Sequence, residues 1–237
     1  MTTNPVISFT KQDKSTAKPH SAMDFLWSED GEITPDDIAF LGVDCETTGL
    51  DQREEDLIQI GIVAFTKDYT PVSYFESAVF SKRALERYRS NELDPVVVDM
   101  HENNGLWSAL GQIEYHGFED EYVADRVEDR ALAWLEMLGL ADKKLPLLGS
   151  SVTLDRSFLQ KYMPALLDAL HYRSVDASSV ITVAANFAGV DEKTVKSLSD
   201  EYSDGPAAHT PVADVLTSAA RTKAAVEFIA HVGNDSE

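Results

Sequence analysis

Three short apolar runs lie close together in the first third of the chain, and they narrow the possible folds more than any other feature. They cover residues 39–43, 57–65 and 72–80. Each has the length of a β-strand, and short turn-forming segments separate them. Strands joined by short connections pair antiparallel, because parallel pairing needs a long crossover. This part of the chain therefore predicts an antiparallel start to a β-sheet.

The rest of the chain alternates helical patterns with another strand. Apolar residues recur at helical spacing in 127–138, 158–170 and 212–229, and a short apolar run at 145–149 precedes the second of these stripes. Pro211 stands where the first turn of a helix tolerates proline. Strands followed by helices that interleave with a further strand predict an α/β domain, with a mixed sheet flanked by helices.

The first 37 residues differ from the rest because they are polar and show no sustained periodicity. A chain of 237 residues suits one substantial domain. We therefore expect a flexible or loosely docked N-terminal extension over residues 1–37, which Phe25, Leu26 and Trp27 could anchor in part. A single domain over residues 38–237 follows it.

The composition limits the cellular compartments in which the protein is expected to act. The chain has one cysteine, Cys45, which excludes an intrachain disulfide framework and fits a reducing compartment. It has no apolar run long enough to span a bilayer, and its first residues lack the pattern of a secretory signal. These features predict a cytoplasmic protein without a membrane partner.

The formal net charge of −21 limits the substrates. Proteins that hold long nucleic acids usually present a basic surface, because counterion release drives that binding. The charge therefore argues against a long duplex nucleic acid as partner. Two possibilities remain: a substrate that is not nucleic acid, or a nucleic acid so short that a local pocket and metal ions suffice.

Asp44 and Glu46 end the first apolar run with one residue between them, so their side chains point to the same face of a strand. Two carboxylates in a partly buried place repel each other unless a proton or a cation bridges them. The strand end is therefore a candidate Mg²⁺ or Mn²⁺ site. The same spacing occurs at Glu54 and Asp56 and at Glu119 and Glu121, in polar surroundings, so spacing alone also fits a solvated pair.

Three further residues are candidate site residues because of their positions in the chain. Asp155 and Asp214 each lie near the expected start of a helix, where a carboxylate is favoured by the helix dipole. His209 lies just upstream of the last helix and could act as a general base. The alternative for Asp155 is simple compensation of the helix dipole. For Asp214 and His209, the alternative is a helix-capping acid and a loop histidine.

The order of these residues resembles the DEDDh superfamily of 3′→5′ exonucleases, and more narrowly the oligoribonucleases. The broader likeness rests on FLGVDCETTGLD (40–51), on GSSVTLDRSFLQKYMP (149–164), and on His209 with Asp214. The narrower one rests on MHENNGLW (100–107), LDRSFLQKYMPALLDALHYRSVDASS (154–179) and HTPVAD (209–214). The resemblance covers about residues 39 to 230.

The resemblance implies a ribonuclease H-like mixed sheet and a 3′→5′ exoribonuclease that hydrolyses dinucleotide-sized RNA to mononucleotides. Two divalent metal ions, Mg²⁺ or Mn²⁺, would be held by Asp44, Glu46, Asp155 and Asp214. His209 would take the proton from the attacking water.

The resemblance also implies how a short oligoribonucleotide would be selected. Leu50 would act as a wedge between the two bases. The residues matching the cap on the 5′ phosphate are His101, Ser151, Arg173 and Ser178. Tyr172 would reach into the site of a second copy, which implies a homodimer.

Two alternatives remain open. The first is a DEDDh exonuclease of the proofreading or tRNA-trimming (ribonuclease T) type, which acts on longer single-stranded DNA or RNA. Thr47, where oligoribonucleases have Met, points that way, and the basic cluster Lys82, Arg83, Arg87 and Arg89 could guide a longer strand. The second is an inactive relative that binds nucleotides or a partner protein.

Overall fold

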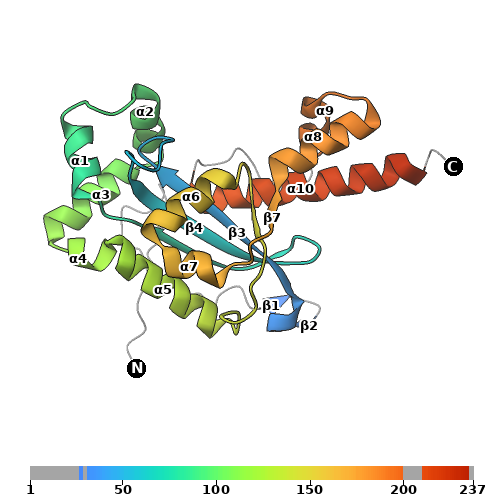
Figure 1. Ribbon diagram of the computed structural model, residues 1–237, viewed down its shortest axis with the longest axis horizontal. Helices are drawn as coiled ribbons and strands as arrows, with labels where there is room; N and C mark the ends of the chain where they lie inside the picture. The colour runs from blue at the N-terminus through green and yellow to red at the C-terminus, as the bar shows by residue number, and fades with distance from the viewer. Residues whose placement is uncertain (1–26, 29–30, 200–209, 235–237) are drawn as a thin grey trace.

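A mixed five-stranded sheet forms the centre of the protein (Figure 1). The structure is a computed structural model that describes residues 27–28, 31–199 and 210–234. The strand order is β5-β4-β3-β6-β7, with β5, β4 and β3 antiparallel and β6 and β7 parallel to β3. The bounds are β3 Ile38–Thr47, β4 Leu57–Thr66, β5 Pro71–Ala78, β6 Leu147–Gly149 and β7 Ser174–Asp176. The predicted α/β class, with its antiparallel start, is confirmed.

Helices cover both faces of the sheet and extend beyond one edge (Figure 1). Their bounds are α1 Lys82–Arg89, α2 Pro95–Asn103, α3 Leu106–His116, α4 Glu119–Tyr122, α5 Ala124–Met137, α6 Thr153–Tyr162, α7 Pro164–Ala169, α8 Ala177–Ala188, α9 Glu192–Ser197 and α10 Pro211–Asn234. Among the described helices, none combines the length and the apolarity that crossing a membrane requires.

The alternation of side chains along β3 assigns them to two layers. Leu41 and Val43 point into the main core, which they share with residues of α5, α6 and α7. On the opposite face, Val63 of β4 packs with Val215 and Ala219 of α10. The even-numbered residues of β3 face α10 because side chains on a strand alternate between the faces. Asp44 and Glu46 are therefore on the α10 side.

The described part of the N-terminal extension contacts the domain. Strands β1 (Trp27–Ser28) and β2 (Gly31–Glu32) pair antiparallel, and Ile33 packs against the main core. A 3-10 turn, Pro35–Asp37, leads into β3. Phe25 and Leu26 lie outside the described residues, so the extension over 1–37 and the domain boundary after it stay predictions.

Candidate active site

The end of β3 carries the first two carboxylates of the site. Asp44 pairs with Gly61 of β4, and Glu46 pairs with Gln59. Glu46 is buried and Asp44 is partly buried, although a strand so close to its end could have left both in water. Burial of carboxylates is costly without a partner, so this strand end is an unusual place for two of them.

Two glycines bring α10 close to the sheet. A Cβ at Gly61 would lie 2.6 Å from Cβ of Pro211 and 2.8 Å from the backbone N of Val212. A Cβ at Gly42 would lie 2.3 Å from Cγ1 of Val215. A larger residue at Gly61 would displace the backbone of α10, and one at Gly42 would displace the side chains of Val215 and Phe65. The first turn of α10 therefore rests directly on β3 and β4, beside Asp44.

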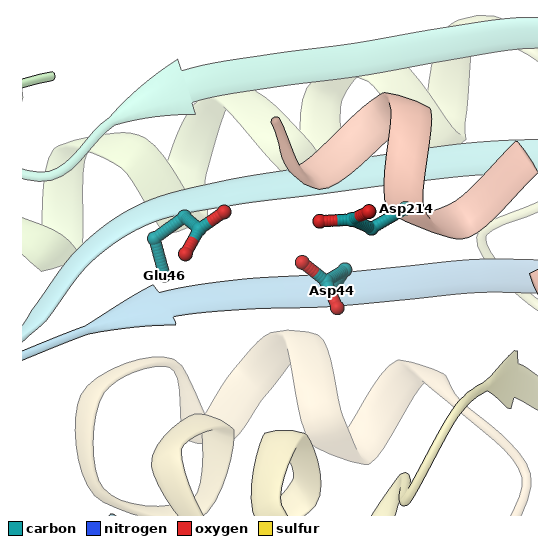
Figure 2. Close-up of side chains that lie close together, drawn as sticks. All are labelled: Asp44, Glu46 and Asp214. Atoms are coloured by element: carbon teal, nitrogen blue, oxygen red, sulfur yellow. The ribbon is translucent and has the colours of Figure 1, made fainter. Parts of the chain in front are cut away.

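This packing of α10 places a third carboxylate, that of Asp214, close to Asp44 and Glu46. Asp214 lies in the first turn of α10, and one ligand atom each from Asp44, Glu46 and Asp214 lies within 4.8 Å of the other two. Figure 2 shows Asp44 and Glu46 rising from β3 towards Asp214 on the helix above them. Residues from the two ends of the domain thus converge on one small volume.

Asp155 lies beside this group and is fixed by the strand itself. Its Oδ1 accepts the backbone N–H of Cys45, the residue between Asp44 and Glu46, at 3.0 Å. The side chain is buried in the first turn of α6. The strand amide thus holds Asp155 next to the other acids, and its charge influences both of them.

Burial and mutual repulsion make these groups hold protons. Burial raises the pKa of Asp44 to about 9, and the negative charges of Asp155 and Glu46 add to this rise. Burial likewise raises the pKa of Glu46 to about 8, with Asp214 as its strongest charged neighbour. Burial also raises the pKa of Asp155 to about 7. In water alone, the site therefore takes up protons near neutral pH.

The donor set suits a hard divalent cation. Carboxylate oxygens are the ligands that Mg²⁺ and Mn²⁺ prefer, and a cation offsets the repulsion that raises the pKa values of these acids. Three converging carboxylates with a fourth beside them satisfy the chemistry of such a site.

His101 lies beneath Glu46 rather than at the surface. Its ring is fully buried, with Nε2 3.1 Å from the carbonyl oxygen of Thr47 and Nδ1 3.8 Å from Oε2 of Glu46. Burial lowers the pKa of His101, which favours the neutral ring. A carbonyl oxygen only accepts, so Nε2 carries the proton and Nδ1 faces Glu46 with its lone pair. The place of His101 in a phosphate cap stays a prediction.

Ser151 and Ser178 follow the ends of β6 and β7, and one carboxylate links their backbones. Ser151 is exposed and has a φ of 57°, in the left-handed region. Asp176 accepts the N–H of Val152 with one oxygen and the N–H of Ser179 with the other. Asp176 therefore holds together the segments that carry Ser151 and Ser178. The predicted roles of these two serines in a phosphate cap stay predictions.

Tyr172 and Arg173 are exposed in the segment before β7. The Tyr172 side chain is 73% exposed and stacks on His171, and the Arg173 guanidinium lies 5.4 Å from its ring centroid. An exposed aromatic ring of this kind is available to a partner surface. Their predicted roles, in a phosphate cap and across a dimer, stay predictions.

Leu50 stands at the tip of the β3–β4 loop, and its side chain is 79% exposed. Ion pairs hold the loop to α1: Arg87 contacts Glu55 at 2.7 Å and Arg83 contacts Asp56 at 2.9 Å. From the other side, the α6 residues Lys161 and Tyr162 donate to the carbonyl oxygen of Glu55. The loop is therefore fixed by contacts at Glu55 and Asp56, while Leu50 at its tip is exposed.

His209 lies outside the described residues, so its predicted role as general base is untested. Glu76 of β5 was not among the predicted site residues. It pairs with Gly61 in the sheet, is buried, and its charge contributes to the raised pKa of Glu46. A single acid in the otherwise apolar and small-residue strand 72–80 was the one signal that could have drawn attention to it.

Comparison with known proteins supports the resemblance drawn from the motifs. No family model matches the chain. It is 27% identical to the oligoribonuclease of Tropheryma whipplei over 195 residues, 79% of this chain and 91% of the relative. It is 34% identical over 143 residues to that of Leifsonia xyli, and 28% identical over 188 residues to the mitochondrial oligoribonuclease of Saccharomyces cerevisiae. These alignments cover 60% and 76% of this chain and 63% of each relative.

Among solved structures, product-bound exonuclease I gives a TM-score of 0.45 at 16% identity, over 82% of this chain and 46% of that one. Exonuclease I in complex with an oligonucleotide gives a TM-score of 0.40 at 14% identity, over 83% and 42% of the two chains. The sequence relatives are the more informative result. The chain is related in sequence to the oligoribonucleases, as its motifs predicted.

Proposed function

We propose that this protein is a metal-dependent 3′→5′ exoribonuclease that hydrolyses very short oligoribonucleotides to mononucleotides. The observation that carries the proposal is the convergence of Asp44, Glu46 and Asp214, from a strand and the last helix, within 4.8 Å. The sequence relationship to oligoribonucleases supports this reaction class for the carboxylate group.

Two divalent cations, Mg²⁺ or Mn²⁺, would be held by these three acids together with Asp155. In such a site the ions would supply positive charge that stabilises the attacking and leaving oxygens of the phosphodiester. The protein's own contribution is a rigid frame. Gly42 and Gly61 set the depth of α10, and the Cys45 amide fixes the fourth carboxylate. Rigid positioning of this kind lowers the cost of reaching the reactive geometry.

His209 would accept the proton of the attacking water. Its sequence position supports the assignment, because it stands two residues before the start of α10, whose first turn carries Asp214. The unperturbed pKa of histidine lies near neutrality, which suits a general base at physiological pH.

The substrate end of the site would be formed by residues around the loop tip and the strand ends. Leu50 would separate the two bases, and its exposure and anchored loop support this role. His101, Ser151, Arg173 and Ser178 would cap the 5′ phosphate, with Arg173 offering a two-pronged donor. Tyr172 would complete the site of the second subunit in a homodimer. The single cysteine supports action in the cytoplasm.

The basic cluster on α1 supports a short substrate over a long one. Arg83, Arg87 and Arg89 each contact an acid within 2.9 Å, and Lys82 lies 3.9 Å from Glu86. Cations that are paired in this way add little to an extended attractive field for a phosphate backbone. A local cap with two metal ions needs no such field.

The test compares purified protein on 5′-labelled RNA of two, seven and about twenty nucleotides, since a backbone-tracking groove would favour the longest. Reactions contain Mn²⁺ or Mg²⁺, with EDTA and Asp44→Asn as controls. Consumption of the dinucleotide far faster than the longer strands supports the proposal. Faster loss of the longest strand would instead identify an exonuclease of the proofreading or tRNA-trimming type. Absence of metal-dependent cleavage at every length would leave a nucleotide- or partner-binding protein.

A further inference from the structure

Glu76 of β5 lies in a row of three residues that crosses the sheet. It pairs with Gly61 of β4, which in turn pairs with Asp44 of β3. Side chains that are directly opposite in neighbouring strands point to the same face. Glu76 therefore stands on the α10 side, one strand further from the cluster than Gly61, and it is only 7% exposed.

The carboxylate of Glu76 accepts the backbone N–H of Val212 in the first turn of α10. Val212 is also the residue whose N would lie 2.8 Å from a Cβ at Gly61. The same turn is closed by the N–H of Asp214, which donates to the carbonyl oxygen of Thr210 at 2.9 Å. The sheet thus holds the turn of Asp214 from below through Gly61 and from the side through Glu76.

The other oxygen of Glu76, Oε1, is buried and makes no hydrogen bond with any residue in the described part of the chain. A buried carboxylate with one oxygen unsatisfied destabilises a fold. Its position also adds repulsion to a cluster that is already crowded with acids. For stability alone, an apolar residue would serve better at this place in the strand.

We propose that Glu76 is a positioning residue for Asp214, which clamps the first turn of α10 to the sheet so that Asp214 meets Asp44 and Glu46 in a geometry ready for a cation. The role rests on the proposed metal-dependent function. Initial N–H groups of a helix have no partner within the helix, so a carboxylate from another element can fix the direction in which the helix begins. Partners that orient metal ligands in this way commonly set metal affinity.

A matched control exists in the same chain. Glu128 of α5 is also buried, and its Oε1 accepts the N–H of Leu166, in the first turn of α7, at 2.9 Å. This contact has the same chemistry as that of Glu76 but lies against the main core, away from α10. Changes at Glu128 therefore report the loss of a helix-capping carboxylate without an effect on Asp214.

The test uses Glu76→Met, which keeps the length of the side chain and removes the acceptor, and Glu76→Gln, which keeps an acceptor. Glu128→Met and Glu128→Gln are made in parallel. Mn²⁺ affinity is measured by titration calorimetry, and amide hydrogen exchange over residues 210–216 is followed in the metal-free protein. Neither readout requires hydrolysis, so a failed function and a failed clamp are distinguishable.

Glu76→Met is expected to weaken Mn²⁺ binding by about 10-fold or more and to speed exchange in the first turn of α10. Glu76→Gln should recover most of the affinity, because its amide oxygen still accepts the N–H of Val212. Glu128→Met should lower thermal stability and leave Mn²⁺ affinity within twofold of the wild type. Unchanged affinity in Glu76→Met, equal losses in Glu76→Met and Glu128→Met, or no recovery in Glu76→Gln would each overturn the proposal.

Discussion

The backbone N–H of Cys45 donates to Oδ1 of Asp155 across 3.0 Å, so the strand that carries two acids of the cluster also orients a third. Because of this contact, the structural role of the Asp155 side chain can be tested separately from the role of its charge. The hydrogen bond needs only an acceptor, whereas a cation needs a negative oxygen.

Asp155→Asn should therefore retain the fold and lose activity. The amide oxygen of Asn still accepts the Cys45 N–H, and the change removes a buried charge, so thermal stability of the metal-free protein should be equal or higher. Hydrolysis of a dinucleotide should fall by several orders of magnitude. Asp155→Leu, which removes the acceptor too, should lower both stability and activity. Substantial turnover by Asp155→Asn would exclude a metal-holding role for this residue.

The pH dependence of metal binding follows from the raised pKa values of Asp44, about 9, and Glu46, about 8. Their pKa values in the unfolded chain are near 4, so between about pH 4 and 9 the folded metal-free protein binds more protons than the unfolded one. The stability that these two groups contribute is fully present below about pH 4 and is lost as pH rises towards 9. A cation displaces these protons, so Mn²⁺ affinity should increase from pH 6 to pH 9.

Calorimetry in buffers of different ionisation enthalpy should show protons released on Mn²⁺ binding at pH 7. The number released should decrease towards pH 9, since fewer protons then remain to be displaced. Asp44→Asn provides the control, because it should release fewer protons and should make the metal-free protein more stable at pH 8. Binding of Mn²⁺ without proton release at pH 7 would contradict the raised pKa values.

Gly61→Ala should disrupt the site from the sheet side. The added Cβ would lie 2.6 Å from Cβ of Pro211 and 2.8 Å from backbone N of Val212, so α10 must shift. We expect a loss of about 1–3 kcal/mol in the free energy of unfolding. Displacement of Asp214 by about 1 Å would reduce turnover by about 100-fold.

Gly111→Ala is the matched control for that change. Gly111 lies within α3, and a Cβ there would have no atom of the structurally described residues within 4 Å. Alanine in a helix interior is favoured over glycine by up to about 1 kcal/mol, so this variant should be more stable and equally active. Chemical denaturation and dinucleotide hydrolysis measure both effects. Normal activity in Gly61→Ala would show that Asp214 tolerates a shift of its helix.

Arg87→Met should loosen the loop that carries Leu50. The Arg87–Glu55 pair is partly buried, and Glu55 also accepts the hydroxyl of Thr48, next to the turn before Leu50. We expect the KM for a dinucleotide to rise by up to about 5-fold, as for an ion pair of about 1 kcal/mol, with little change in kcat. Arg89→Met, which breaks a pair with Glu114 away from the loop, should leave both constants unchanged. Equal effects of the two variants would point to net charge as the cause.

Much of the fold is readable from the sequence because its elements show clear periodicity. The three antiparallel strands and the start of α10 at Pro211 match the prediction. The apolar stripe over 158–170 is divided into α6 and α7 at Met163 and Pro164, since proline cannot continue a helix. The four helices between β5 and α5 were not assigned. Three of them, α1, α2 and α4, have only 8, 9 and 4 residues, too few for a sustained apolar pattern. In α3, by contrast, the buried residues Leu106, Leu110 and Ile113 do stand at helical spacing.

The site was predictable to the extent that motifs mark it. The structure brings Asp44, Glu46 and Asp214 together, with Asp155 beside them, and the catalytic and metal-binding roles of these residues stay predictions. Glu76 could not be identified, because its position opposite Gly61 depends on the register of two strands whose pairing shifts between Ala64 and Phe65. A slip of one residue would turn its side chain to the other face. The burial of His101 under Glu46 likewise depends on how α2 packs, which no local pattern records.

The position of Asp214 on the last helix has a consequence for biosynthesis. A nascent chain that has left the ribosome only as far as α8 already contains every strand of the central sheet, and with it Asp44, Glu46 and Asp155. The fourth carboxylate arrives only when α10 has been translated and has docked on Gly42 and Gly61. If the proposed function holds, the group of four carboxylates on which it depends is therefore complete only after α10, Pro211–Asn234, has been synthesised.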